Sequence, residues 1–142
     1  HAGFALKREM IARISEISDN IEFLDLGPGD ETSVDYPDFS RKLCEALLKK
    51  QGDAGILICG SGQGMAIQAN RHKGIRAALV WSIETAKLAR EHNNANVIAV
   101  GGRMHEVSFV KEIIDTFIAS PFSNEERHVR RIKKISDFEN KG

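Results

Sequence analysis

The chain has 142 residues, of which 42% are hydrophobic and 28% charged, and its 20 basic and 20 acidic side chains give a formal net charge of zero. This length and composition predict one globular domain over residues 1–142, and a neutral chain has no overall field to attract nucleic acid or a membrane surface. The two cysteines, Cys44 and Cys59, lack metal-ligand spacing, and no apolar run is long enough to cross a membrane. We therefore expect a cytoplasmic protein without a disulfide framework, and the cysteines give no indication of a metal site.

Helical and strand patterns alternate along the chain. Apolar residues recur at helical spacing from Phe4 to Ile17 and predict a first helix. The predicted elements that follow are a strand at 21–26, a turn-rich loop at 27–36, a helix at 37–48, a strand at 55–59, a helix at 63–70, a strand at 76–80, a helix at 83–92, a strand at 96–100 and a helix at 107–119. Ser123–Glu126 has the form of a capping box and predicts the start of a last, C-terminal helix. This alternation predicts an α/β fold, in which helices cover both faces of a doubly wound parallel sheet of about five strands.

The first predicted element is a helix, whereas a doubly wound sheet of this kind begins with a strand. That first strand would be central in the sheet and hard to omit. We therefore expect further residues upstream of His1 in the native protein, with His1 lying just after the strand that they form.

The segment 54–66 is an apolar run that ends at Cys59 and continues with alternating glycines. It predicts a buried strand that leads through a glycine-rich loop into a helix, and the backbone N–H groups of such a loop can bind an anion. The positive end of the helix favours a thiolate at Cys59, which could act as a base or a nucleophile. An ordinary strand–helix corner without chemistry has the same pattern. Gly60, Gly62 and Gly64 depart from the G-x-G-x-x-G spacing of dinucleotide-binding loops, so a nicotinamide or flavin is not expected.

Polar motifs follow some predicted strands and precede others. His1, Cys59–Ser61 and Gly101–Arg103 come after strands, at the carboxyl edge where open α/β sheets bind ligands. His92 and Asn93 precede a strand and therefore lie at the amino edge. A strand of five or six residues is about 17–20 Å long, so a catalytic His92 would have to serve the site of a neighbouring subunit. The alternative is that His92 only ends a helix, where an imidazolium suits the helix dipole.

The last predicted helix carries basic residues four positions apart. Arg127 and Arg131 share one face, and Arg130 and Lys134 share another. Two arginines on one face can bind a phosphate through several charge-assisted hydrogen bonds. A solvated basic face is the alternative, and the lack of aromatic residues within the stripe argues against nucleic acid.

Several further motifs occur in one order along the chain. They are HAGFALK at 1–7, VDYP at 34–37, ICGSGQGM at 58–65, Ala69–Asn70, GIRA at 74–77, EHNNANV at 91–97 and the run from Arg127 to Arg131. Together these motifs resemble the ribose-5-phosphate isomerase B family, and the resemblance covers essentially the whole chain. It implies a Rossmann-like fold and a metal-independent isomerase that interconverts ribose 5-phosphate and ribulose 5-phosphate through an enediolate. It also implies a homodimer with active sites shared across the interface, with tetramers left open.

The resemblance implies a role for each matching residue. Cys59 would be the base that moves a proton between C1 and C2, and Ser61 would contact the sugar near that base. His92 would help to open the furanose ring by proton transfer to the ring oxygen, and Asn93 would bind the oxyanion region. The backbone N–H groups of the glycine-rich loop would stabilise the developing oxyanion. The residues expected to bind substrate are His1, Tyr36, Gly60, Gly62, Gly64, Asn93, Arg103, Arg127 and Arg131.

The chain departs from the family pattern at three places. The aspartate that the family has before the residue matching His1 cannot be assigned. Glu125 and Glu126 replace two glycines before the phosphate-binding arginine, and these acids could weaken phosphate binding if they point inward. Some members use a glutamate as base at the position of Met65, which cannot take a proton, so this chain falls with the members that use cysteine.

Other readings stay open at this point. A six-carbon aldose phosphate, such as allose or galactose 6-phosphate, is an alternative substrate. A non-catalytic sugar-phosphate sensor on the same fold would keep Arg127 and Arg131 but would not need Cys59. Of the remaining residues, Cys44 and Trp81 are expected in the core.

Overall fold

The computed structural model describes residues 7–8, 25–27, 29 and 35–141. Its sheet consists of the parallel strands β1 (Gly55–Cys59), β2 (Ala77–Leu79) and β3 (Val97–Gly101), in the order β1-β3-β2. Val97 at the start of β3 pairs with Gly55 on one side and with Ala77 on the other. Because the strands are parallel, their carboxyl ends share one edge of the sheet and their amino ends share the other.

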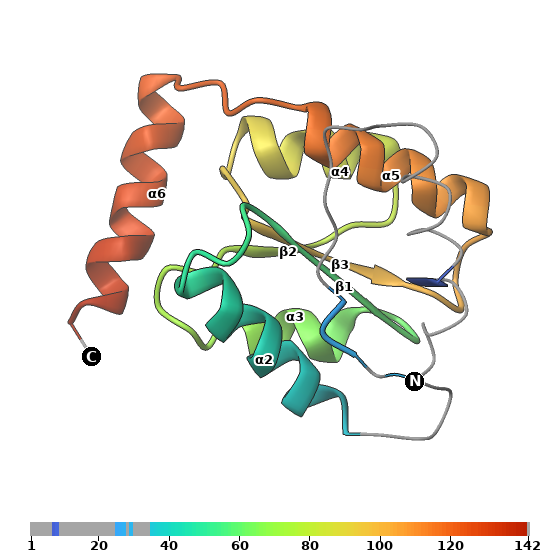
Figure 1. Ribbon diagram of the computed structural model, residues 1–142. Coiled ribbons are helices and arrows are strands. Elements are labelled where there is room, and N and C mark those ends of the chain that lie inside the picture. Colours follow the sequence, from blue (N-terminus) through green and yellow to red (C-terminus); the bar gives the residue numbers. More distant parts are fainter. Residues whose placement is uncertain (1–6, 9–24, 28, 30–34, 142) are drawn as a thin grey trace.

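Helices cover both faces of the sheet (Figure 1). The helices α2 (Tyr36–Leu48) and α3 (Gln63–Ala69) lie on one face, and α4 (Ile83–Glu91) and α5 (Val107–Ala119) lie on the other. Alternate side chains of β3 reach the two layers: Val97 and Ala99 pack with α2 and α3, whereas Ile98 and Val100 pack with α4 and α5. A strand buried on both faces reads as a continuous apolar run, which is why the pattern at 96–100 predicted it. The expected α/β fold is confirmed.

Burial agrees with expectation for one of the two predicted core residues. Cys44 is fully buried in the layer of α2 and α3. Trp81 is 59% exposed, so its predicted place in the core is wrong. Val80, which precedes it, is buried instead, and neighbouring side chains of an extended segment point to opposite sides.

A last helix is present, but its predicted start is wrong. The helix α6 (Glu126–Glu139) has Glu125 as its N-cap, without a side-chain hydrogen bond at the cap. Asn124 has a φ of +58°, so the chain cannot be helical there. The Ser123 hydroxyl instead accepts a hydrogen bond from the Glu125 N–H at 3.3 Å.

The helix α6 stands apart from the two helical layers, beside the amino edge of the sheet (Figure 1). Segment 120–125, which has no regular structure, joins it to α5. Its contacts with the rest of the chain include a hydrogen bond from the Gly74 N–H to Glu139 Oε2 at 3.2 Å. His128 is its one buried residue, and the apolar Ile135 and Phe138 are 49% and 78% exposed.

Several expectations lie outside the described residues. Of the first predicted helix only Lys7 and Arg8 are described, and both are helical. Of the predicted strand at 21–26 only Asp25 and Leu26 are described, and neither is in a strand. A strand upstream of His1 lies outside as well, so the expected total of about five strands stays a prediction. No helix in the described part of the chain is both long and apolar enough to cross a membrane.

Candidate active site

Cys59 is the last residue of β1, and its half-buried thiol faces the loop that follows. The Gly62 N–H donates a hydrogen bond to Cys59 Sγ at 3.1 Å. Gly62 can do so because its φ of +82° turns the chain back toward the strand end, a conformation that glycine adopts without strain. The helix α3 starts at the next residue, so the sulfur lies at a helix N-terminus with a backbone donor aimed at it.

Close packing around the glycines brings two side chains to this loop. A Cβ at Gly64 would lie 2.5 Å from the Tyr36 hydroxyl, and a Cβ at Gly60 would lie 3.3 Å from Arg103 Nη1. The Tyr36 ring therefore rests on the start of α3, and the Arg103 guanidinium rests on the loop. Ser61 is exposed, and its hydroxyl oxygen accepts a hydrogen bond from the Gln63 N–H at 3.4 Å.

The loop after β3 is tied to the loop after β1. The Gly102 N–H donates to the Cys59 carbonyl at 2.6 Å, and the Arg103 N–H donates to the Gly60 carbonyl at 3.2 Å. These bonds extend the pairing of Cys59 with Gly101 beyond the ends of the strands. The structure thus gathers one set of predicted site residues, which we term the carboxyl-edge group: Tyr36, Cys59, Gly60, Ser61, Gly62, Gly64 and Arg103.

His92 lies at the other edge, as the C-cap residue of α4. Its ring stacks on the ring of His128 from α6, with centroids 4.2 Å apart and 15° between the planes. His128 is 4% exposed, and its Nε2 has no hydrogen-bond partner among the described residues, although Glu125 Oε2 is 3.8 Å away. Burial lowers the pKa of His128, and the neighbouring His92 and Arg127 lower it further. This imidazole is therefore held in its neutral form more firmly than an exposed one.

The two arginines predicted to bind phosphate are both exposed on α6. Arg127 Nε donates to Glu125 Oε2 at 3.0 Å, whereas Arg131 has no ion pair within the described part of the chain. Arg130, on the other stripe, binds both oxygens of Glu126 at 2.9 and 2.7 Å. Glu125 and Glu126 therefore both pair with arginines of this helix. We term the predicted residues at this end of the molecule, together with His128, the amino-edge group: His92, Asn93, Arg127, His128 and Arg131.

The carboxyl-edge and amino-edge groups do not meet within one chain. Cys59 pairs with the last residue of β3, whereas His92 precedes the first residue of β3 by five positions. In Figure 1 the helix α6 stands at the end of the sheet opposite to the carboxyl end of β1. An open cleft of about 400 Å³ lies between α6 and the amino edge, lined by Arg76, Asn93 and Glu139 among others, and not beside Cys59. His1 lies outside the described residues.

The chemistry available is that of a thiol, imidazoles, guanidinium groups and backbone donors. No group of three or more His, Cys, Asp or Glu side chains within the described ranges could hold a metal ion. Sequence reasoning missed His128 as the partner of His92, because contact between residues 36 positions apart has no local pattern. It also missed Arg76, whose one available signal was a basic residue directly before an apolar strand.

Comparison with known proteins gives consistent matches over nearly the whole chain. The family described as Ribose/Galactose Isomerase matches residues 1–135. A ribose-5-phosphate isomerase B of Mycobacterium leprae is 41% identical over 140 residues, covering 98% of this chain and 85% of the relative. The type B ribose 5-phosphate isomerase of Trypanosoma cruzi superposes with a TM-score of 0.95 at 44% identity, covering 100% and 95% of the two chains. The ribose-5-phosphate isomerase B of Mycoplasma genitalium with bound ribulose-5-phosphate gives a TM-score of 0.92 at 39% identity, covering 100% and 93%.

Proposed function

Because the chain belongs to the ribose/galactose isomerase family, we propose that it is an isomerase that interconverts ribose 5-phosphate and ribulose 5-phosphate. The observation that carries the proposal is the Cys59 thiol, which ends β1 and accepts a hydrogen bond from the Gly62 N–H. Isomerisation of an aldose needs a base at the carbon next to the carbonyl and donors for the oxyanion that develops. Cys59 and the glycine-rich loop offer both.

Cys59 acts on the open-chain form of the sugar. The thiolate takes the proton from C2, and the electron pair forms the double bond between C1 and C2 of an enediolate, with negative charge on O1. The thiol then returns the proton to C1 while O1 gains a proton and the C2 hydroxyl loses one to become the ketone. Ser61 contacts the sugar beside the thiol, and the backbone N–H groups of Gly60 and Gly64 stabilise the oxyanion, while the Gly62 N–H binds Cys59 Sγ.

The residues of the amino-edge group serve the steps before proton transfer. His92 opens the furanose ring by proton transfer to the ring oxygen, and Asn93 binds the oxyanion region. Arg127 and Arg131, with His1, hold the phosphate through charge-assisted hydrogen bonds. Tyr36 and Arg103 add contacts to the substrate from the carboxyl edge.

We infer a homodimer in which each active site takes Cys59 from one copy and His92 from the other. The support is geometric: the strands of one chain keep the two edges of the sheet apart, and α6 leaves apolar side chains such as Phe138 exposed. We also expect a cytoplasmic location, since both cysteines are free thiols.

Turnover of ribose 5-phosphate in the presence of a chelator tests the activity. We expect metal-independent turnover that is lost in Cys59→Ala while the variant still binds the sugar phosphate. Turnover of allose 6-phosphate or galactose 6-phosphate, but not of ribose 5-phosphate, would show that the substrate is a six-carbon aldose phosphate instead. Sugar-phosphate binding without turnover, unaffected by Cys59→Ala, would indicate a sensor.

Mixed dimers test the shared site. Alone, Cys59→Ala should be nearly inactive and His92→Asn should keep only a few per cent of the parent activity, but refolding the two together in equal amounts should restore about a quarter of it, because half of the dimers then carry one intact site. A mixture that stays inactive, although it contains mixed dimers, would contradict a site shared between copies.

A further inference from the structure

The turn between α4 and β3 is held by two arginine side chains. Arg76 Nε donates to the Asn93 carbonyl at 3.0 Å, and Arg76 Nη2 donates to the Asn94 carbonyl at 2.9 Å. Arg90 Nη1 donates to the Ala95 carbonyl at 2.7 Å and to Asn94 Oδ1 at 2.8 Å. Three successive carbonyls of a surface turn are thus bound by guanidinium groups. Asn94 has a φ of +44°, a conformation that needs such support in a residue other than glycine.

Arg76 is itself fixed directly before β2. Its backbone N–H donates to Asn96 Oδ1 at 2.8 Å, and its carbonyl accepts from the N–H groups of Asn96 and Val97 at 3.1 and 3.3 Å. Asn96 Nδ2 also donates to the Gly74 carbonyl at 2.8 Å. The stem of Arg76 is therefore anchored to the same turn that its guanidinium binds.

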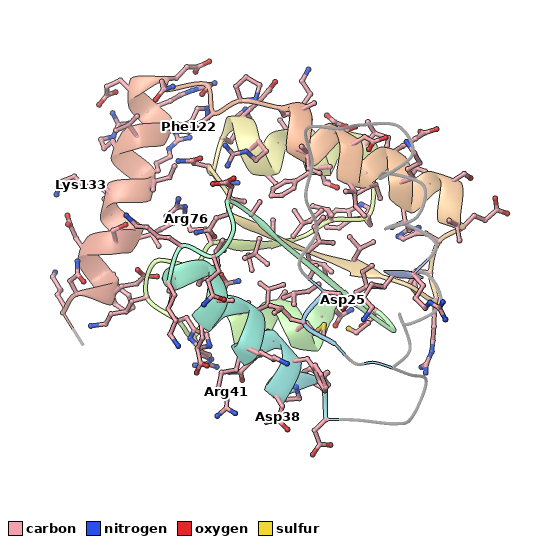
Figure 2. All side chains as sticks on the ribbon, viewed as in Figure 1. Asp25, Asp38, Arg41, Arg76, Phe122 and Lys133 are labelled. Carbon is pink, nitrogen blue, oxygen red and sulfur yellow. The ribbon has the colours of Figure 1, made fainter. Side chains whose placement is uncertain are left out.

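Burial makes this placement costly for Arg76. Burial lowers the pKa of the Arg76 guanidinium; Glu139 on α6 raises this pKa, and Arg90 lowers it further. A lysine or arginine that served only as a surface charge would lie in water. Figure 2 places Arg76 between the sheet and α6, in contrast to Arg41, which lies on the outer side of α2.

The residues that this turn carries are the ones that the proposed reaction uses. Asn93 is the first residue whose carbonyl Arg76 binds, and His92 precedes it directly. The His92 backbone is fixed on its other side by the hydrogen bond from its N–H to the Leu88 carbonyl, and its ring is fixed by the stack on His128. Arg76 thus supplies the constraint on the side of the turn.

We propose that Arg76 is a positioning residue that fixes His92 and Asn93 for catalysis by bridging the carbonyls of Asn93 and Asn94. The proposal rests on the proposed function, in which His92 and Asn93 act on the sugar. The planar fork of arginine offers two donors in a fixed geometry, which one ammonium group cannot reproduce. A reacting group displaced by about 1 Å can lose up to about a hundredfold in rate.

A double-mutant cycle tests this role. We compare Arg76→Lys in the parent and in the His92→Asn/Asn93→Ala background, measuring kcat and KM for ribose 5-phosphate and the melting temperature. In the parent we expect kcat to fall about tenfold with KM nearly unchanged, because the phosphate is held by other residues. In the double-variant background we expect the same change to cost less than about twofold, because the groups that Arg76 positions are gone.

Control variants separate this role from a structural one. Arg41→Lys, an exposed arginine paired with Asp38 and Glu45 at 4.0 and 3.9 Å, should leave every quantity unchanged. If Arg76→Lys does not fold, Arg76→Gln replaces it, since one amide can still donate to one carbonyl. An equal loss of kcat in both backgrounds, or no loss in the parent, would overturn the proposal. Absence of turnover in the parent, or full turnover in Cys59→Ala, would instead overturn the proposed function.

Discussion

The two edges of the sheet are built in different ways. At the carboxyl edge, backbone groups and glycines position the side chains: the Gly62 N–H donates a hydrogen bond to Cys59 Sγ, and Gly64 leaves space for the Tyr36 ring. At the amino edge, side chains bind other segments: the His92 ring stacks on His128. The thiol and its backbone donor at the carboxyl edge therefore come from one continuous motif, onto which Tyr36 and Arg103 pack, whereas the pairing of imidazoles at the amino edge depends on contact between residues distant in the sequence.

This difference has a consequence for chemistry. Side chains pack closely on the glycines of the loop after β1, so the loop backbone has little space to move. A fixed backbone suits a base that must reach one carbon atom. Imidazoles and guanidinium groups on the amino edge depend on the position of α6, which stands apart from the helical layers (Figure 1). On the proposed function, a second copy of the chain would bring one edge of each kind into the same site.

The two cysteines give the largest expected difference. Cys59→Ala should lower turnover by about a thousandfold, because it removes the base. Cys44 is fully buried, and burial raises the pKa of its thiol to about 11, so it stays a neutral core side chain. Cys44→Ala should keep the turnover and lower the free energy of unfolding by about 1 kcal/mol. Initial rates and thermal melts of both variants check this; comparable turnover in the two would contradict it.

The next largest effect is expected at the arginines of the amino edge. Arg131→Ala should raise KM for ribose 5-phosphate about thirtyfold, equivalent to about 2 kcal/mol, because it removes charge-assisted bonds to the phosphate. Glu125→Gln should lower KM about threefold, because Glu125 Oε2 competes for Arg127 at 3.0 Å. Glu126→Gln, which releases Arg130 instead, is the matched control. Steady-state kinetics decide, and equal effects of the two glutamate variants would refute competition for Arg127.

Glycine substitutions test how far the carboxyl edge depends on its backbone. Gly62→Ala should lower the free energy of unfolding by about 2 kcal/mol, because φ is +82° and a Cβ would lie 2.8 Å from Leu79 Cδ1. Gly52→Ala is the control, since a Cβ there meets one atom, the Ala54 carbonyl oxygen, at 3.9 Å. Denaturant titration measures both. A Gly62→Ala variant as stable as Gly52→Ala would show that the loop adapts more readily than its packing indicates.

The smallest effect is expected from protonation at the amino edge. The pKa of His128 is lowered below its ordinary value of 6.5 in the folded chain, so the unfolded chain binds the proton more readily. Its contribution to stability is therefore complete above pH 6.5 and is lost as the pH falls through the lowered pKa. His128→Phe keeps a ring against His92 but cannot titrate, and its stability should fall less between about pH 7 and pH 5. His105→Phe is the control. If the stability of His128→Phe depended on pH as strongly as that of the parent, His128 would not be the source of this pH dependence.

Local patterns sufficed for most of the fold that the structure describes. The run at 55–59 and the helical spacing at 107–119 predicted β1 and α5 with their observed bounds. A buried strand leaves a short apolar run in the sequence, and a helix buried along one stripe leaves apolar residues at helical spacing. The start of α6 was predicted wrongly, because the left-handed Asn124 interrupts a sequence that otherwise has the form of a capping box. Trp81 was assigned to the core, although Val80 takes the buried position.

The sequence by itself determined the α/β fold, the thiol at the end of β1 and the edge of the sheet at which each motif lies, since strand direction follows from the order of the elements. Tertiary structure alone decided that His92 stacks on His128 and that Arg76 binds the carbonyls of Asn93 and Asn94. The physical reason is range. Periodicity and turn chemistry act over a few residues and are visible in the chain, whereas a contact between distant residues exists only once the layers have packed around the sheet.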